Sequence, residues 1–406
     1  MPSKVSGKRN GVKPTTAFII RIKLLITKSL VKIIMDKTLF IHKDCQNSDL
    51  AKHLKAANPE HKVKSITTNT QITNPEYNLF SINPKDRFLQ KKKLIGLLKR
   101  DAKWNVDPNG RSTDFLPSLM MEQGCYKFGC SYCYTERNYP NNFLKIYNDL
   151  FKVVELSKFI EDNEENLEHK FFQINKKKFE KNRDPKHPKM ITIDLGCDSD
   201  VVTSNSTTIH DNYHGHMVDV MNQIATNTTK IMTSFATKSA EIDPFITGIK
   251  YPNKHRIRLS LMPEHHRQIL EQNTSKITDR LVAVNKLVDA GFEVHLNLSP
   301  IVVTKDFIQE YDSLLALVNN SLSQKAKDQM AYEIIFLTHS EKMVEPIQCS
   351  VPKAHDMMVN GPLKLVPKWN KPNVLSYSKG DKNNLKAKMN YVINKNTPYS
   401  RIRYMF

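Results

Sequence analysis

Short apolar runs alternate with longer amphipathic segments along most of this chain. From residue 115 onward, six apolar runs have the length of buried β-strands, at 116–121, 190–195, 230–235, 256–262, 292–298 and 332–337. Segments with helical spacing of apolar residues separate them, near 143–160, 210–226, 274–290 and 306–322. This alternation is typical of β/α units around a parallel sheet. Six strands fit a partial barrel or an open doubly wound sheet, and both place chemistry at the carboxyl ends of the strands.

The same pattern divides the chain into regions. Before the alternating part, the sequence looks like a mixed α/β preamble, with a short strand at 39–41 and a helix at 50–57. A strongly charged stretch that ends in Asp-Pro-Lys-His-Pro is predicted to be an exposed insertion. The predicted regions are a basic extension at 1–34, an N-terminal α/β region at 35–115, a barrel at 116–345 with its insertion at 161–189, and a basic C-terminal region at 346–406.

The net charge of +20 in 406 residues bears on the partners. Such an excess predicts attraction to a polyanion such as DNA or to an anionic membrane surface, and it equally suits a solubilising surface. Residues 1–34 hold eight basic and no acidic residues. We expect a disordered extension before Met35, although a targeting presequence or a nucleic-acid arm would carry the same charge. No uninterrupted apolar run reaches the roughly 20 residues that span a bilayer, so we expect no membrane partner.

The end of the chain is especially basic. Residues 363–406 contain ten Lys and Arg residues but one acidic residue, Asp381. Tyrosines and Trp369 are interleaved with these charges, a combination that suits contact with DNA. The alternative is an ordinary tail whose aromatic residues pack inward.

Half of the six cysteines lie within nine residues. Cys125, Cys130 and Cys133 are close enough in sequence to share one metal centre. A closed structural zinc site takes four protein ligands, whereas an iron–sulfur cluster held by three cysteines leaves one iron open. The uneven spacing of the cysteines does not form a disulfide framework, so we expect an intracellular, reducing compartment such as the cytoplasm or nucleus.

The Cys-x4-Cys-x2-Cys loop resembles the Cys-x3-Cys-x2-Cys loop of the radical S-adenosylmethionine (SAM) enzymes. Its surroundings resemble one family of them, the spore photoproduct lyases, from about Leu39 to the C-terminus. Tyr132 and Tyr134 match the family's Cys-His-Tyr-Cys-Tyr ending of the loop. Further matches follow in register, at Cys197-Asp-Ser199-Asp200-Val-Val202, Thr237-Lys238, Arg258-Leu-Ser260, Thr274–Arg280, Ala290-Gly291-Phe, Ser299-Pro300-Ile301 and Leu337-Thr338-His339.

This resemblance implies a partial (β/α)6 barrel of the TIM type, with an N-terminal α/β extension and a basic C-terminal segment. It implies a [4Fe-4S] cluster on the three cysteines of the loop, with SAM bound at the open iron. The implied reaction is the repair of the spore photoproduct, a thymine dimer in ultraviolet-damaged DNA, to two thymines through a 5′-deoxyadenosyl radical. An electron donor that the sequence does not identify must reduce the cluster.

The resemblance also implies individual roles. Cys197 would give a hydrogen atom to the product thymine radical, and Tyr132 and Tyr134 would relay the radical back toward SAM. Judged alone, a cysteine after a buried strand is more often an inert core residue. The residues implied to bind SAM are Ser199, Lys238, Asp194, Arg258 and Ser260, with Lys238 suited to the SAM carboxylate.

The sequence departs from the family pattern at two places, and two other functions stay open as alternatives. The loop has one extra residue between its first two cysteines, and Asp194 stands where the family has a glutamate. A radical SAM enzyme acting on another nucleotide or RNA would keep the fold and the cluster. A non-enzymatic, metal-stabilised nucleic-acid-binding protein is disfavoured, because no histidine lies at finger-like spacing after Cys133.

For most of the remaining cysteines and histidines, the sequence predicts no bound metal. Cys45 and Cys349 are predicted to be unligated. His265 and His266 fall in a polar stretch that is predicted to be a loop without a metal. His339 follows a predicted strand and is a candidate for lining the pocket.

Overall fold

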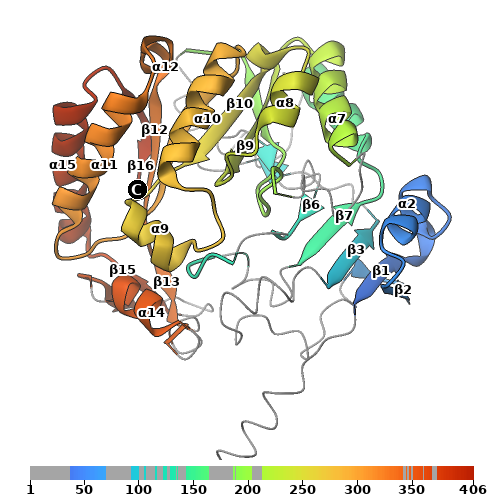
Figure 1. Cartoon of the computed structure of the whole chain (residues 1–406), viewed down its shortest axis with the longest axis horizontal. Coiled ribbons are helices and arrows are strands. Elements are labelled where there is room, and N and C mark those ends of the chain that lie inside the picture. Colours follow the sequence, from blue (N-terminus) through green and yellow to red (C-terminus); the bar gives the residue numbers. More distant parts are fainter. Residues whose placement is uncertain are drawn as a thin grey trace, which may run out of the picture. The chain divides into compact units, whose positions relative to one another are not determined.

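The structure is a computed structural model that describes residues 37–69, 93–99, 105–106, 115–116, 122–125, 129–133, 135, 143–163, 186–187, 189–203, 213–341, 344, 347–348, 351–359, 361–367 and 373–406. Contacts join Lys37–Phe406 into one unit, which contains a large curved sheet, two smaller sheets and their helices (Figure 1). The extension predicted at 1–34 and most of the insertion predicted at 161–189 lie outside the described residues. Among the helices that are described, none has the length and apolar content needed to cross a membrane.

Eight strands form the large curved sheet, in the order β16-β12-β11-β10-β9-β8-β5-β4. They are β4 (Asn105–Val106), β5 (Phe115–Leu116), β8 (Ile191–Asp194), β9 (Ile231–Thr237), β10 (His255–Ser260), β11 (Glu293–Ile301), β12 (Ala331–Phe336) and β16 (Arg401–Met405). Neighbours pair in parallel, except for the antiparallel pair of β4 and β5. Parallel neighbours require crossover connections, and helices provide most of them here.

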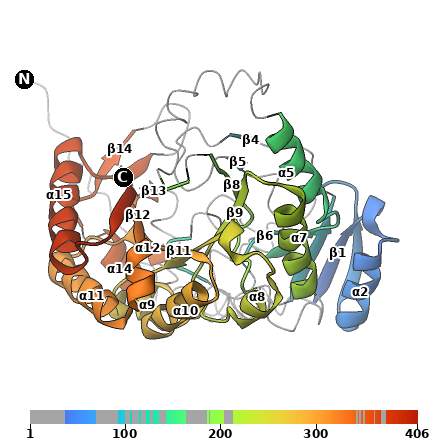
Figure 2. The same cartoon turned by 90° about the horizontal axis from the view of Figure 1, so that it is seen from above.

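Helices cover the outer face of this sheet (Figure 2). They are α5 (Lys152–Asp162), α7 (Tyr213–Asn227), α8 (Asp243–Gly248), α10 (Ile277–Asp289), α11 (Phe307–Ser321), α12 (Gln324–Gln329) and α15 (Lys379–Asn396). The 3-10 turn η5 (Pro252–Lys254) precedes β10, and α9 (Glu264–Leu270) follows that strand at its carboxyl end.

Alternate residues of each strand face two different environments. Ile257 and Leu259 of β10 belong to the apolar core beneath the helices. Arg256, Arg258 and Ser260 point to the opposite face, because side chains alternate along a strand, and they are buried as well. The inner face of the curved sheet is therefore polar and charged. Polar side chains from several strands also lie at its carboxyl edge.

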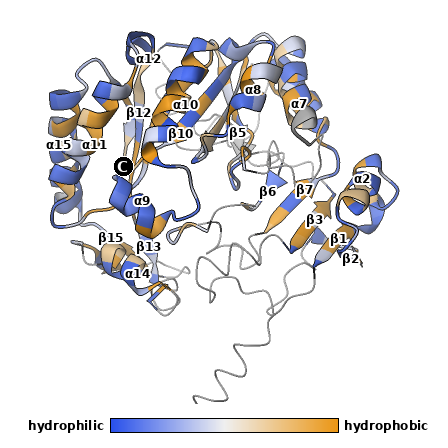
Figure 3. Ribbon diagram, viewed as in Figure 1, coloured by the Kyte–Doolittle hydropathy of each residue, from blue (hydrophilic) through white to orange (hydrophobic). Residues whose placement is uncertain are grey.

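A second sheet of five strands precedes the barrel, in the order β2-β1-β3-β7-β6. Its elements are β1 (Thr38–His42), η1 (Lys43–Cys45), α2 (Asp49–Ala57), β2 (Lys62–Ile66), β3 (Leu94–Leu98), β6 (Glu122–Gln123) and β7 (Leu144–Tyr147). Strands β1 and β3 are buried along their whole length and appear largely hydrophobic in Figure 3. The last strand, β6, is antiparallel to β7 and leads directly into the cysteine loop.

The C-terminal region continues the fold of the barrel. Strand β16 pairs in parallel with β12 at the end of the large sheet, and α15 packs against α11. A small antiparallel sheet and a helix lie before them, formed by β13 (His339–Ser340), β14 (Lys364–Val366), β15 (Val374–Ser376) and α14 (Pro352–Val359). The regions predicted at 116–345 and 346–406 thus share one sheet.

The predicted partial barrel is confirmed. The six predicted strands correspond to β5 and to β8 through β12, which are consecutive neighbours in the sheet. Of the strand expected at 116–121, β5 ends at Leu116 and residues 117–121 lie outside the described residues. The helix expected near 143–160 is wrong in its first part, because β7 occupies Leu144–Tyr147 and buries its side chains in the second sheet. The stretch that contains His265 and His266 is helix α9, not a loop.

Candidate active site

The cysteine loop is held by backbone hydrogen bonds on two sides. Gly124 has a φ of 86°, a conformation that favours glycine, and its N–H donates to the Asp198 carbonyl over 3.0 Å. The Ser131 N–H donates to the Leu270 carbonyl over 2.9 Å. Because Asp198 follows β8 and Leu270 ends the helix after β10, the loop is tied to the carboxyl edge of the barrel.

The three loop thiols influence one another. Cys130 is buried, whereas Cys125 and Cys133 are partly exposed. Burial raises the pKa of Cys130 well above its ordinary value, and Glu271 and the two neighbouring thiols raise it further. A bare thiolate is disfavoured here, but a bound metal deprotonates a coordinating thiol outright. Three thiols in mutual electrostatic contact, at the end of a sheet, therefore fit the ligand set of a metal cluster.

Cys197 lies next to this loop. It is partly exposed in the turn after β8, one residue before Asp198, whose carbonyl accepts the hydrogen bond from Gly124. In the same turn, Thr203 Oγ1 lies 3.8 Å from Cys125 Sγ. Two contacts thus bring the Cys197 turn and the first cysteine of the loop together. Tyr134, predicted to relay the radical, lies outside the described residues.

Lys238 follows β9, and Asp200 fixes its backbone. The Lys238 N–H donates to Asp200 Oδ2 over 2.7 Å, and the Thr237 hydroxyl donates to Asp200 Oδ1 over 2.8 Å. The Thr203 hydroxyl donates to the Asp200 carbonyl over 2.8 Å. These bonds join the turn that contains Cys197 to the strand end that presents Lys238.

Glu271 is the centre of a buried charge group that no sequence motif indicates. It is 1% exposed, and its carboxylate accepts hydrogen bonds from the Tyr132 hydroxyl and, over 2.8 Å, from Arg280 Nη2. Lys238 Nζ lies 6.0 Å from the centre of the Tyr132 ring. Burial by itself lowers the pKa of Lys238, but Glu271 and Cys130 hold it above its ordinary value. A charged ammonium therefore stands beside the cysteine loop.

Asp194 and Arg258, both predicted to bind SAM, pair with each other. Arg258 Nη2 donates to Asp194 Oδ2 over 2.8 Å, and the Gly196 N–H donates to Asp194 Oδ1 over 2.9 Å. Burial alone lowers the pKa of Arg258, but Asp194 and Glu333 raise it above its ordinary value. Both side chains are thus engaged on the inner face of the sheet, and their direct contact with SAM stays a prediction.

Three polar atoms along this edge are buried without a hydrogen-bond partner among the described residues: Ser199 Oγ, Ser260 Oγ and Asn297 Oδ1. Ser260, at the end of β10, is the register partner of Asn297, which lies in the middle of β11. Because an unsatisfied buried polar atom costs about 1–3 kcal/mol, the edge suits a polar ligand. SAM carries amino, carboxylate and hydroxyl groups and fits these atoms and the charge of Lys238. Asn297 joins the candidate residues on structural grounds alone.

Comparisons with known proteins agree with this geometry. The family model described as spore photoproduct lyase matches residues 35–406. A solved spore photoproduct lyase variant with bound AdoMet and dinucleoside spore photoproduct has a TM-score of 0.70 and 17% identity, and covers 92% of this chain and 100% of its own. A spore photoproduct lyase complexed with dinucleoside spore photoproduct has a TM-score of 0.70 and 18% identity, with the same coverage of 92% and 100%.

Proteins with curated descriptions give no match to this sequence. At the identities above, the solved structures establish the fold, and the family model over nearly the whole chain establishes the family. The chain belongs to the spore photoproduct lyase family.

Proposed function

We propose that this protein is a radical SAM lyase that returns the spore photoproduct in ultraviolet-damaged DNA to two thymines. The family match over residues 35–406 carries the proposal. The arrangement of the carboxyl edge supports it, because the cysteine loop, the Cys197 turn and Lys238 are joined there by the hydrogen bonds of Gly124 and Asp200.

The cofactors follow from the family and from the donor set. Cys125, Cys130 and Cys133 would hold the [4Fe-4S] cluster, and Lys238, Ser199 and Ser260 would hold SAM. When both are bound and an electron donor has reduced the cluster, they would supply a 5′-deoxyadenosyl radical that abstracts a hydrogen atom from the lesion. The protein contributes the orientation of SAM through the charge of Lys238 and the polar atoms that lack partners.

Cys197 would act after the bridge between the two bases has broken. Its S–H bond breaks as a C–H bond forms on the remaining thymine radical, which leaves a thiyl radical on Sγ. A hydrogen atom from a tyrosine hydroxyl would then restore the thiol and leave a tyrosyl radical, which a hydrogen atom returned from 5′-deoxyadenosine would quench. Tyr132 is one candidate for this donor, since it lies within the cysteine loop and its hydroxyl donates to the Glu271 carboxylate. Tyr134 is the second candidate.

The substrate and the cell impose further requirements. A base inside a duplex must be exposed before it can react, and a damaged step is less costly to unstack. The net charge of +20 would provide sequence-independent attraction to the phosphates. An oxygen-sensitive cluster requires a reducing surrounding, so we infer an intracellular location and an electron donor from the same compartment.

The direct test begins with anaerobically reconstituted protein, which should be brown and contain about four iron and four sulfide per chain. It is incubated with SAM, dithionite and ultraviolet-irradiated DNA that contains the spore photoproduct, and the products are separated by chromatography. We expect loss of the photoproduct and recovery of thymine. Cleavage of SAM without any loss of the photoproduct would refute the proposed substrate, and colourless protein that contains zinc would refute the radical chemistry.

The role of Cys197 has its own test. Cys197→Ala should keep the cluster and still cleave SAM, because the ligands and Lys238 are unchanged. It should fail to convert the lesion cleanly to thymines, and other products should accumulate from the unquenched radical. Cys45→Ala is the matched control, since Cys45 lies buried beside the second sheet. Equal thymine yield from the wild-type protein and Cys197→Ala would exclude hydrogen donation by Cys197.

A further inference from the structure

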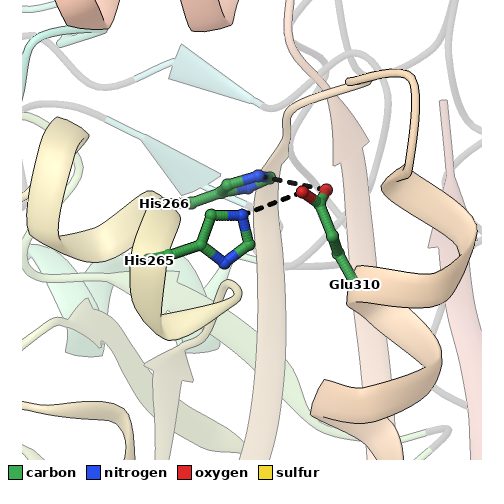
Figure 4. A group of neighbouring side chains, drawn as sticks. All are labelled: His265, His266 and Glu310. Atoms are coloured by element: carbon green, nitrogen blue, oxygen red, sulfur yellow. Dashed lines mark hydrogen bonds and ion pairs between the residues drawn. The ribbon is translucent and has the colours of Figure 1, made fainter.

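Two histidines and a glutamate meet where α9 faces α11 (Figure 4). His265 Nε2 lies 2.8 Å from one carboxylate oxygen of Glu310, and His266 Nε2 lies 3.1 Å from the other. One ligand atom from each of the three residues can be chosen so that all lie within 4.8 Å of one another. These residues come from elements that follow two neighbouring strands, β10 and β11, and they include none of the cysteines.

His266 is poorly satisfied by the protein around it. Its side chain is fully buried, and neither ring nitrogen forms a hydrogen bond with any described residue. The approach of Nε2 to Glu310 therefore lacks hydrogen-bond geometry despite its short distance. A neutral imidazole offers the lone pair of one ring nitrogen to a metal ion. A buried imidazole that points at a carboxylate but forms no hydrogen bond with it needs a further group to which both can bind.

A hydrogen bond from Thr304 orients the carboxylate of Glu310. The Thr304 hydroxyl donates to Glu310 Oε2 over 2.6 Å. The ring of Tyr311, the next residue, packs edge-on against His266, with ring centres 6.3 Å apart. Supporting hydrogen bonds of this kind fix the ligands of metal sites and are costly to remove.

We propose that His265, His266 and Glu310 form a binding site for a divalent transition-metal ion of the zinc type. Two imidazoles and one carboxylate are a common ligand set for zinc, and a fourth position would stay open to water. Ligand atoms around a tetrahedral zinc ion are roughly 3.3 Å apart. The three candidate ligand atoms lie within 4.8 Å of one another, so the side chains would have to draw together by at most about 1.5 Å to bind the ion. This proposal does not depend on the proposed function.

Such an ion would clamp α9 to α11. The far end of α9 already holds the cysteine loop, because the Leu270 carbonyl accepts from Ser131 and Glu271 accepts from Tyr132. The metal site therefore sits at one end of a two-turn helix whose other end supports the candidate active site. Binding of the ion would stabilise this helix and, through it, the position of the loop.

The experiment measures Zn²⁺ binding to protein whose cysteine loop is already loaded with its iron–sulfur cluster. The protein is stripped with a chelator under conditions that preserve cluster absorbance, dialysed against Zn²⁺, and analysed for zinc by mass spectrometry. We expect one zinc ion per chain and a higher melting temperature with Zn²⁺ than without. His265→Ala should lose both effects. Its side chain is 51% exposed, so the variant should fold.

Two further variants sharpen the result. Thr304→Val keeps all three ligands and should weaken zinc binding by about 10- to 100-fold. His355→Ala is the matched control, because His355 also lies near a carboxylate, 3.3 Å from Asp356 Oδ1, but without a second histidine beside it; its zinc binding should equal that of the wild-type protein. No zinc on the wild-type protein, or equal zinc on the wild-type protein and His265→Ala, would overturn the proposal and leave a hydrogen-bonded cluster.

Discussion

Individual polar atoms at the carboxyl edge show where a ligand is expected. Ser260 Oγ is buried and has no hydrogen-bond partner among the described residues, although its own carbonyl accepts from Arg280 Nη1 over 2.6 Å. The backbone of Ser260 is thus held by the buried charge group, while its hydroxyl is unused. Removing this hydroxyl breaks no hydrogen bond to the residues that the structure describes.

The matching prediction concerns Ser260→Ala. Its unfolding midpoint without SAM should equal that of the wild-type protein, because the hydroxyl is hydrogen-bonded to none of the described residues. Its affinity for SAM should fall by roughly 2- to 10-fold, the value of one neutral hydrogen bond. Equilibrium dialysis of SAM against cluster-loaded protein measures this change. Ser313→Ala, whose hydroxyl donates to the Gln309 carbonyl on α11, should bind SAM normally. Undiminished affinity in Ser260→Ala would remove Ser260 from the SAM site.

The sequence predicted some residues of this site and missed others, for a physical reason. Lys238 and the cysteines stand in local motifs that a family shares. Glu271 does not, because its role depends on Tyr132, which is 139 positions away in the chain. Glu310 likewise meets His265 across 45 positions. Contacts between distant segments arise from packing, and no local pattern encodes them.

At the scale of elements, the spacing of the apolar residues was sufficient to predict the barrel strands. Each strand places one apolar face under the helices, and this face is what the pattern reveals. The pattern failed at β7, because Leu144–Tyr147 is short and runs close to the start of α5. It also missed β16, where Arg401 and Arg403 alternate with less polar residues and point toward the inner charges of the sheet.

Those inner charges link neighbouring strands. Glu333 of β12 is fully buried and accepts a hydrogen bond from the Tyr404 hydroxyl of β16 over 3.0 Å. His295 Nδ1 of β11 lies 3.3 Å away from its carboxylate, and Arg258 Nη1 of β10 lies 3.6 Å away. Burial alone raises the pKa of Glu333, but His295 and Arg258 hold it below its ordinary value, so the carboxylate stays ionised.

Glu333→Gln should therefore destabilise the barrel by about 1.5–3 kcal/mol, because it removes the charged contacts of Glu333 with Arg258 and Arg403, while Arg258 keeps its pair with Asp194. Urea unfolding, followed by circular dichroism under anaerobic conditions, measures the free energy of unfolding. Glu341→Gln provides the control, since Glu341 is exposed and its carboxylate accepts only a surface hydrogen bond from Asn373 among the interactions described for it. Its midpoint should not change. If both variants unfolded at the same urea concentration, the inner charges would not be what joins these strands.

At the scale of the whole molecule, the positive charge is concentrated at the two ends of the sequence, and residues 1–34 carry eight basic and no acidic residues. Residues 363–406 carry ten Lys and Arg residues against one acidic residue, and thus net +9 of the total +20. Part of this charge is already paired within the protein, because Lys395 forms an ion pair with Asp312 over 2.8 Å and Arg401 approaches Glu293. The lysines along α15 remain the best candidates for contact with DNA, and this role stays a prediction.

The triple variant Lys379→Gln, Lys386→Gln and Lys388→Gln tests it. Fluorescence anisotropy with undamaged duplex DNA, at several salt concentrations, gives the affinity and its salt dependence. If all three lysines contact phosphates, the slope of log affinity against log salt should become shallower by about 3, since each contact contributes about 0.9. Lys52→Gln, Lys55→Gln and Lys62→Gln, on α2 and β2, remove the same net charge elsewhere and should change the slope much less. Equal effects of the two triple variants would mean that DNA responds to total charge, with no special contribution from α15.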